Sequence, residues 1–358
     1  MGPRAVHQVL VTLHQGDAMG NEAFAIRGLL RRAGVRSEIF AEKTDPALRG
    51  EARPLARYAE ESKGGAVCLF HFSPGGSAGE WVASLPGPLV VVYHNLTPAH
   101  FFEAWDRRMA DLATAGRQLL QRLAPRAALA IAKSEFSRRE LQLAGYARTA
   151  VVPIVMDWRA YETRPSPVVR RLFRDGRRNV LFVGRIVPNK RFEDLVRSFA
   201  AFHREIEPRS RLLLVGSTQG QERYLGHLLQ LTRRHGIERD VVFTGHVPHD
   251  DLLAYYSVAD VFLCLSEHEG YGVPLLEAMH AGVPVAAYAA AAVPETLRGG
   301  GVLLGDKRPD LVAGLLGCLI DDAALRSAVL EVQQAVIRRL RETDLGALFL
   351  ERLAPVLG

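Results

Sequence analysis

Short apolar runs alternate with longer amphipathic segments along most of the chain. Runs suited to buried strands occupy residues 7–13, 37–40, 66–72, 88–94, 127–132 and 149–153. Helix-like periodicity occupies residues 22–33, 101–123 and 134–144 between them. Strands that alternate with helices in this way predict βαβ units and a parallel sheet covered on both faces.

The alternation restarts after a connecting segment near residues 155–166. The second set of strands is expected at 179–183, 212–215, 241–244, 261–265, 283–287 and 302–304. Its helices are expected at 192–206, 222–235, 250–257, 274–281 and 309–320. A chain of 358 residues also exceeds what one hydrophobic core usually supports. We therefore expect an α/β protein whose parts are residues 1–156, residues 157–340, and a C-terminal helix over 341–358 that packs back on the first domain.

Composition narrows the class of protein without indicating its chemistry. Hydrophobic residues make up 48% and charged residues 23%, which is ordinary for a globular protein. No apolar run approaches the roughly 18 residues of a membrane span, and the N-terminus lacks the apolar core of a secretory signal. A cytoplasmic protein is expected. Cys68, Cys264 and Cys318 are scattered in apolar contexts, which predicts core thiols rather than disulfides or a zinc site.

The charge of the chain points to anionic partners. Its net charge is +6 and its pI is near 9.4, yet it lacks the basic and aromatic interleaving of nucleic-acid modules, so no nucleic-acid partner is expected. Within residues 107–139, eight cations are opposed only by Asp111 and Glu135. A solvated helix face is favoured there, and peripheral contact with an anionic membrane is the alternative. The apolar residues that would face the bilayer are Trp105, Leu112, Leu119 and Leu120.

The segment 266–279, SEHEGYGVPLLEAM, has the most specific chemical pattern. It places Glu269 and Glu277 on either side of a Gly-Tyr-Gly-Val-Pro turn that follows an apolar strand. Pro274 suits the first turn of a helix, where its missing N–H is no loss. A helix N-terminus preceded by flexible backbone binds phosphate, and ionised carboxylates accept strong hydrogen bonds from sugar hydroxyls. The segment therefore predicts a sugar-nucleotide site.

Two cations follow the first strand of the second domain, in the sequence FVGRIVPNKR. Arg185 can grip phosphate oxygens in a fork, and Lys190, five residues on, adds a movable point charge. Fixed cations aimed at a departing nucleoside diphosphate stabilise the transition state more than the ground state. A solvated basic loop is the alternative, but the nearby Glu269 and Glu277 weaken it.

These motifs resemble the retaining GT-B glycosyltransferases, above all the large family 4. The resemblance rests on the FVGR strand end, on Arg185 and Lys190, and on EGYGVPLLEAM followed by GVPVAAY and VPETL. It covers most of residues 178–305 and extends more loosely to the first domain. It implies two Rossmann-like parallel-sheet domains facing an interdomain cleft, with a nucleotide-sugar donor on the second and a glycan or glycolipid acceptor on the first. It implies no metal and no other cofactor, since the cations take the place of a metal.

The resemblance also implies individual roles. Glu269 would contact hydroxyls of the transferred sugar, and Glu277 would bind the ribose hydroxyls. Gly16 and Gly20 match a glycine-containing loop that approaches the donor phosphates, with a plain turn as the alternative. That loop lacks the GxGxxG spacing of a dinucleotide site. Backbone approach to sugar and diphosphate is implied at Gly184, Gly270, Tyr271, Gly272 and Val273.

Polar residues in the first domain are less specific. His94 ends the strand PLVVVYHN, where it can bond a sugar hydroxyl or orient the acceptor, and it completes the expected catalytic set. His71 is placed similarly, with function and structure equally favoured. Lys133, Ser134 and Glu135 follow a strand, and we expect a capping serine with solvated neighbours.

The function expected from this pattern is retaining transfer of a hexosyl unit from a nucleoside-diphosphate sugar to a sugar or lipid-linked sugar of a cell-surface glycan. The work would take place in the cytoplasm, or peripherally at the inner face of the membrane. The alternatives are another GT-B enzyme, such as a sugar-nucleotide epimerase or a glycan phosphorylase, and a catalytically silent nucleotide-sugar-binding protein. The pattern specifies neither the donor base nor the sugar.

Overall fold

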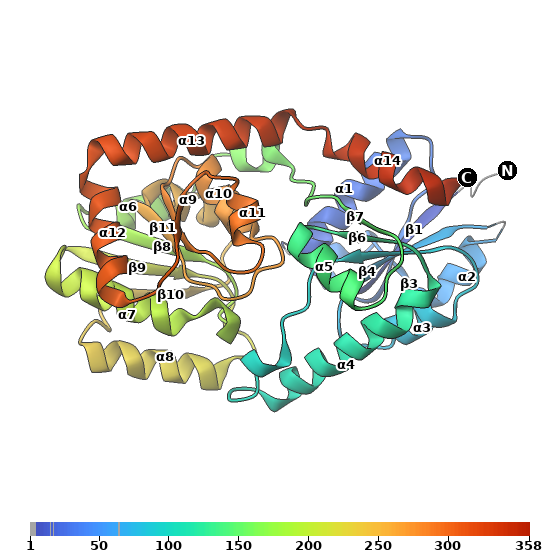
Figure 1. The fold of residues 1–358 in the computed structure, drawn as a ribbon, viewed down its shortest axis with the longest axis horizontal. Coiled ribbons are helices and arrows are strands. Elements are labelled where there is room, and N and C mark those ends of the chain that lie inside the picture. The colour runs from blue at the N-terminus through green and yellow to red at the C-terminus, as the bar shows by residue number, and fades with distance from the viewer. Residues whose placement is uncertain (1–4, 15, 17, 64) are drawn as a thin grey trace. The chain divides into compact units, whose positions relative to one another are not determined.

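The computed structural model describes residues 5–14, 16, 18–63 and 65–358, which form two compact units (Figure 1). Unit 1 comprises residues up to His100, Arg107–Asp157 and Asp344–Gly358. Unit 2 comprises Phe101–Asp106 and Trp158–Thr343. The chain therefore passes from one unit to the other four times, after residues 100, 106, 157 and 343.

Unit 1 contains a seven-stranded parallel sheet in the order β3-β2-β1-β4-β5-β6-β7. Its strands are β1 (Val6–Leu13), β2 (Ile39–Thr44), β3 (Arg53–Pro54), β4 (Val67–Phe72), β5 (Leu89–Tyr93), β6 (Ala127–Ala132) and β7 (Thr149–Val151). Its helices are α1 (Ala18–Arg32), α2 (Tyr58–Glu61), α3 (Ala78–Ser84), α4 (Arg107–Leu123), α5 (Glu135–Leu143) and α14 (Leu345–Leu357). The parallel sheet confirms the α/β class expected for this part of the chain.

Each face of this sheet is covered by helices because side chains alternate along every strand. Along β4, Phe70 and Phe72 pack on one side in a core that includes Leu119 and Leu120 of α4. Val67 and Leu69 of the same strand belong to a second core, which residues of α1 and α14 complete. Phe349 and Leu353 of α14 are fully buried there, and α14 lies beside α1 (Figure 1).

Unit 2 contains a six-stranded parallel sheet in the order β10-β9-β8-β11-β12-β13. Its strands are β8 (Arg178–Val183), β9 (Ser210–Val215), β10 (Val241–Gly245), β11 (Val261–Cys264), β12 (Val285–Tyr288) and β13 (Val302–Leu304). Its helices are α6 (Pro167–Phe173), α7 (Phe192–Glu205), α8 (Glu222–His235), α9 (His249–Val258), α10 (Val273–His280), α11 (Val293–Leu297), α12 (Pro309–Asp321) and α13 (Ala323–Glu342). Pro274 occupies the first turn of α10, as expected from the sequence.

Two local expectations were wrong. The helix expected over 101–123 begins only at Arg107, because the preceding residues leave unit 1 and place Trp105 against Tyr224 and His227 of α8 in unit 2. Cys318 is exposed on α12, whereas the other two cysteines are buried. Within the described ranges, no helix is both long and apolar enough to cross a membrane.

Candidate active site

The loops after β8 and β11 bring Lys190 and Glu269 together. These two strands are neighbours in the sheet, so the loops that follow them meet at its carboxyl edge, where open α/β sheets bind ligands. The ammonium of Lys190 lies 2.5 Å from Oε2 of Glu269. The two side chains are 19% and 10% exposed. The pair is therefore largely desolvated, and both side chains keep a small exposed part.

Backbone contacts fix the loop that carries Lys190. Residues 188–190 form a single helical turn, and the amide of the buried Asn189 donates to the carbonyl of His268 over 2.9 Å. The N–H of Glu267 donates back to the carbonyl of Asn189. Sequence reasoning missed Asn189, whose partners lie almost 80 positions away along the chain. These bonds hold the loops after β8 and β11 at a fixed spacing.

Gly184 lies where two backbone segments approach each other closely. A Cβ atom built on Gly216, at the end of β9, would lie 2.0 Å from the carbonyl oxygen of Gly184. No side chain fits at Gly216, so its glycine allows the loop after β8 to cross the end of β9. Gly216 was also missed from the sequence, although it follows a strand in the segment LLLVGS.

Arg185 is a cation at the carboxyl edge of the unit 2 sheet. It is exposed, and among the residues that the structure describes it makes no ion pair. Lys307, which follows β13, is in contrast bonded to Asp194 over 2.7 Å and to Glu267 over 2.5 Å. A guanidinium without a carboxylate partner can bind an anionic ligand without first breaking an internal ion pair.

The glycine turn between the two glutamates starts α10. Gly272 has a φ of +92° and stands immediately before the helix, which begins at Val273. The carbonyl of Tyr271 accepts the hydroxyl hydrogen of Thr296 in α11, so the turn is tied to the next helix. Gly270 and Tyr271 thus lie between the end of β11 and the N-terminus of α10, as the strand-turn-helix pattern predicted.

Glu277 is buried and bonded by two tyrosines. The hydroxyl of Tyr161 donates to Oε1 over 2.7 Å, and the hydroxyl of Tyr256 donates to Oε2 over 2.6 Å. Burial raises the pKa of the Glu277 carboxyl, and the tyrosine hydrogen bonds and the nearby His249 partly oppose this shift. Each carboxylate oxygen has a second lone pair, so Glu277 can still accept hydroxyl hydrogens from a ligand.

The free energy of unfolding of Glu277→Gln, compared with that of the parent protein, is expected to increase as pH rises above about 4.5, the ordinary pKa of a glutamate. In the parent protein, the Glu277 carboxyl keeps its proton to higher pH in the folded state than in the unfolded state. The stability that this carboxyl contributes is therefore lost as pH rises through its folded pKa. Urea unfolding of both proteins between pH 4.5 and 8 measures the difference.

The matched control for that experiment is Glu331→Gln, which removes an exposed carboxylate from α13. The difference between Glu277→Gln and the parent should change with pH more than the difference for the control. A flat or opposite pH dependence at Glu277 would contradict the raised pKa.

The two glycines predicted to form one loop in unit 1 lie in different elements. Gly16 is exposed with a φ of +77°, in the turn between β1 and α1. Gly20 is buried within the first turns of α1 rather than in that turn. The apolar residues Leu119 and Leu120 of α4 belong to the core of the unit, so they do not face outward.

His94 belongs to a buried polar cluster at the carboxyl ends of β4 and β5. Its Nε2 lies 2.9 Å from Nδ1 of His71, and its Nδ1 lies 3.6 Å from Oε2 of Glu22. Lys133 contacts the other oxygen of Glu22 over 2.7 Å, and both side chains of this ion pair are 1% exposed. The expectation that Lys133 is solvated was therefore wrong, because its charge is neutralised by a residue of α1. The neighbouring Ser134 caps α5, as expected, by accepting the N–H of Ser137.

The cluster offers ligands of the kind that metals take. One ligand atom each from Glu22, His71 and His94 lies within 4.8 Å of the others. The ammonium of Lys133, however, already supplies a positive charge to Glu22, and the two imidazoles are hydrogen-bonded to each other. The arrangement is suited to hydrogen-bonding a ligand more than to coordinating a cation.

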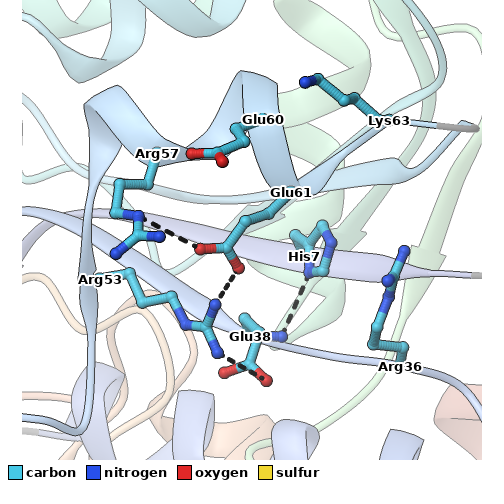
Figure 2. A pocket seen from close by; sticks show the side chains of 8 residues that line it. All are labelled: His7, Arg36, Glu38, Arg53, Arg57, Glu60, Glu61 and Lys63. Atoms are coloured by element: carbon cyan, nitrogen blue, oxygen red, sulfur yellow. Dashed lines mark hydrogen bonds and ion pairs between the residues drawn. The ribbon is translucent and has the colours of Figure 1, made fainter.

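A separate pocket lies at the opposite, amino-terminal edge of the unit 1 sheet (Figure 2). It is lined by His7, Arg36, Glu38, Arg53, Arg57, Glu60, Glu61 and Lys63. Arg53 lies 3.5 Å from Glu38, and Arg57 lies 3.7 Å from Glu61, so much of the positive charge is offset internally. None of the predicted site residues contributes to this pocket.

Two parallel α/β units, with polar residues gathered at the carboxyl ends of their strands, define a protein of the GT-B class. Residues 169–331, somewhat less than half of the chain, match the family described as Glycosyl transferases group 1, and the fold of the chain is of the GT-B kind.

Curated relatives match over part of the chain. The O-antigen chain mannosyltransferase B of Escherichia coli is 31% identical over 144 residues, which cover 40% of this chain and 37% of the relative. A GDP-mannose-dependent alpha-(1-6)-phosphatidylinositol monomannoside mannosyltransferase of Mycobacterium tuberculosis is 33% identical over 173 residues, 44% of each chain. The matched segments thus span less than half of these relatives.

Solved structures match the whole chain in fold. Anabaena Alr3699/HepE, in complex with UDP and glucose, superposes with a TM-score of 0.73 at 20% identity and covers 98% of this chain and 99% of its own. WaaG, a glycosyltransferase involved in lipopolysaccharide biosynthesis, superposes with a TM-score of 0.71 at 15% identity over 98% and 99% of the two chains. At this identity the likeness concerns the fold alone.

Proposed function

We propose that this protein is a retaining glycosyltransferase that moves a hexosyl unit from a nucleoside-diphosphate sugar to a sugar or lipid-linked sugar acceptor in cell-surface glycan synthesis. The observation that carries the proposal is the Lys190–Glu269 pair, which lies with the exposed Arg185 at the ends of adjacent strands. The segment that contains all three residues matches a glycosyltransferase family.

The geometry suits departure of a nucleoside diphosphate. The Lys190 ammonium has three N–H bonds and uses one on Glu269, so it can bridge that carboxylate and a phosphate oxygen. Arg185 binds the diphosphate in a fork, and both cations stabilise the charge that develops as the glycosidic bond breaks. A phosphate oxygen of the leaving group takes the proton of the acceptor hydroxyl, which attacks from the same face.

The remaining residues position the donor in this proposal. Glu269 accepts a hydroxyl of the sugar, and Glu277, oriented by its two tyrosines, accepts the ribose hydroxyls. The backbone around Gly270 and Gly272 approaches the sugar and the diphosphate. His94 bonds a sugar hydroxyl or orients the acceptor. The proposal needs no metal ion and no other cofactor.

The relatives suggest which donors to test. GDP-mannose is named for the mycobacterial relative, and UDP and glucose are named for the Anabaena structure. We infer a glycan or glycolipid acceptor from the same relatives. Contact with an anionic membrane would depend on the cations of residues 107–139, because Leu119 and Leu120 are buried.

A screen of thermal stability against UDP, GDP, ADP and their sugars tests the donor proposal. At a ligand concentration of 100 times Kd, a binder adds about 2.7 kcal/mol to the free energy of unfolding, so at least one nucleotide sugar should raise Tm clearly. Slow hydrolysis of that donor would support an enzyme over a silent binding protein. No shift with any of these compounds would contradict the proposal, and an inverted anomeric product by NMR would contradict the retaining mechanism.

A further inference from the structure

Four polar side chains form a connected series inside unit 1, and the proposed reaction uses only His94. Nε2 of Gln8 donates to the backbone carbonyl of Ala23 over 2.9 Å. Oε1 of Gln8 lies 2.8 Å from Nε2 of His71, and Nδ1 of His71 lies 2.9 Å from Nε2 of His94. Glu22 stands beside the far side of the His94 ring.

The backbone carbonyl at one end sets the direction of every bond in this series. A carbonyl only accepts, so the amide nitrogen of Gln8 must face Ala23 and its oxygen must face His71. Nε2 of His71 therefore carries a hydrogen. Burial, reinforced by the charge of Lys133, lowers the pKa of His71 to about 3, which keeps this ring neutral at physiological pH. A neutral imidazole has one N–H, so Nδ1 of His71 accepts.

The same reasoning shows which ring nitrogen of His94 carries the hydrogen. Its Nε2 must donate to His71, and burial, together with His71 and Lys133, holds the pKa of His94 well below its ordinary value. The single hydrogen of His94 is then on Nε2, and Nδ1 carries a lone pair. Within the part of the chain that the structure describes, the nearby Oε2 of Glu22 is buried without a hydrogen-bond partner. Two acceptors therefore stand 3.6 Å apart with no hydrogen between them.

We propose that Gln8 and His71 are positioning residues that lock His94 in its Nε2–H tautomer, so that Nδ1 of His94 and Oε2 of Glu22 form an acceptor pair for one ligand hydroxyl. The tautomer lock follows from the bonds within unit 1. The hydroxyl ligand rests on the proposed function, since a sugar is the hydroxyl-bearing group that His94 would meet.

The tautomer lock is tested by ¹⁵N NMR of histidine rings in the full chain, with signals assigned through single His→Asn variants. His71 and His94 should each show a protonated Nε2 and an unprotonated Nδ1 from pH 6 to pH 8. A protonated Nδ1 on His94, or an imidazolium at either ring, would overturn the lock whatever any variant does. Stoichiometric metal in the purified protein would overturn it equally, since Glu22 and the two histidines would then be ligands.

Gln8→Met tests the positioning role, because it keeps the length of the side chain and removes the oxygen that accepts the hydrogen of His71 Nε2. The ring nitrogen signals of His94 should move toward those of a mixture of tautomers. The signals of His203, which bonds Ser210 in unit 2, should stay unchanged as an internal control. Unchanged His94 signals would refute the role of Gln8, and Gln8→Leu replaces Gln8→Met if that variant does not fold.

The ligand part is tested by adding UDP or UDP-glucose, and GDP or GDP-mannose, to the same labelled protein. A bound nucleotide sugar should shift the Nδ1 signal of His94 toward the hydrogen-bonded range, and the matching nucleotide should not. Binding of the sugar nucleotide with no such difference would overturn the acceptor pair alone. Failure of these four compounds, and of ADP and its sugars, to bind would overturn both the acceptor pair and the proposed function, while the tautomer lock is decided by the free protein.

Discussion

Lys190→Ala is expected to lower the rate of donor turnover by about 10²–10³-fold, while the protein keeps its fold. The ammonium is placed to stabilise charge that exists fully only in the transition state, so its loss should reduce kcat more than donor affinity. The measurement is release of nucleoside diphosphate from whichever donor the stability screen identifies, with circular dichroism as the check of folding. Turnover equal to that of the parent protein would remove Lys190 from the anion site.

Arg185→Ala separates the loss of a cation from the loss of a local ion pair. Lys190 also neutralises Glu269, and its removal leaves that carboxylate without its partner. Arg185 is exposed and, within the described chain, unpaired, so its removal should lower turnover with little change in Tm. Arg308→Ala is the matched control, because the Arg308 side chain is 63% exposed and, among the described residues, forms its ion pair with the nearby Asp306. Equal losses of turnover in Arg185→Ala and Arg308→Ala would indicate a general effect of net charge and not a specific role of Arg185.

Lys133→Met is expected to destabilise the protein by about 3–5 kcal/mol, since it leaves the carboxylate of Glu22 buried without its counter-charge. For a unit of this size, Tm should fall by on the order of 10 °C. Adding Glu22→Leu to Lys133→Met should restore most of the loss, because two apolar groups need no partner. Thermal unfolding of the two variants and the parent measures both effects.

The control for the buried pair is an exposed pair in the same unit. Arg122 contacts Glu80, and the two side chains are 52% and 63% exposed. Arg122→Ala should cost no more than about 1 kcal/mol, because solvent screens such pairs. If Lys133→Met were as mild as Arg122→Ala, the Lys133–Glu22 contact would not be a desolvated ion pair.

Local patterns were sufficient for the fold and for much of the candidate site. Strand and helix periodicities are properties of neighbouring residues, so the two parallel sheets followed from them. Glu269, Gly272 and Pro274 lie within one strand-turn-helix segment, whose spacing can be recognised without any tertiary contact.

Partners distant in the sequence could not be predicted in this way. Lys133 looked solvated because its counter-ion, Glu22, lies 111 positions away. Tyr161 bonds Glu277 across 116 positions, and nothing in the local sequence marks it as a site residue. The start of α4 was misplaced for a similar reason, since the contacts of Trp105 with α8 take residues 101–106 out of the helix.

The return of α14 to unit 1 has a consequence for how the protein acquires its structure during synthesis. Phe349 and Leu353 are part of the same core as Val6 and Val67, so that core stays incomplete until a ribosome has released residues near position 353. Unit 2 is encoded almost entirely between residues 158 and 343 and can condense earlier. The strands of unit 1 therefore leave the ribosome well before the helix that completes their core, and the apolar face that α14 covers must stay protected until α14 has been made.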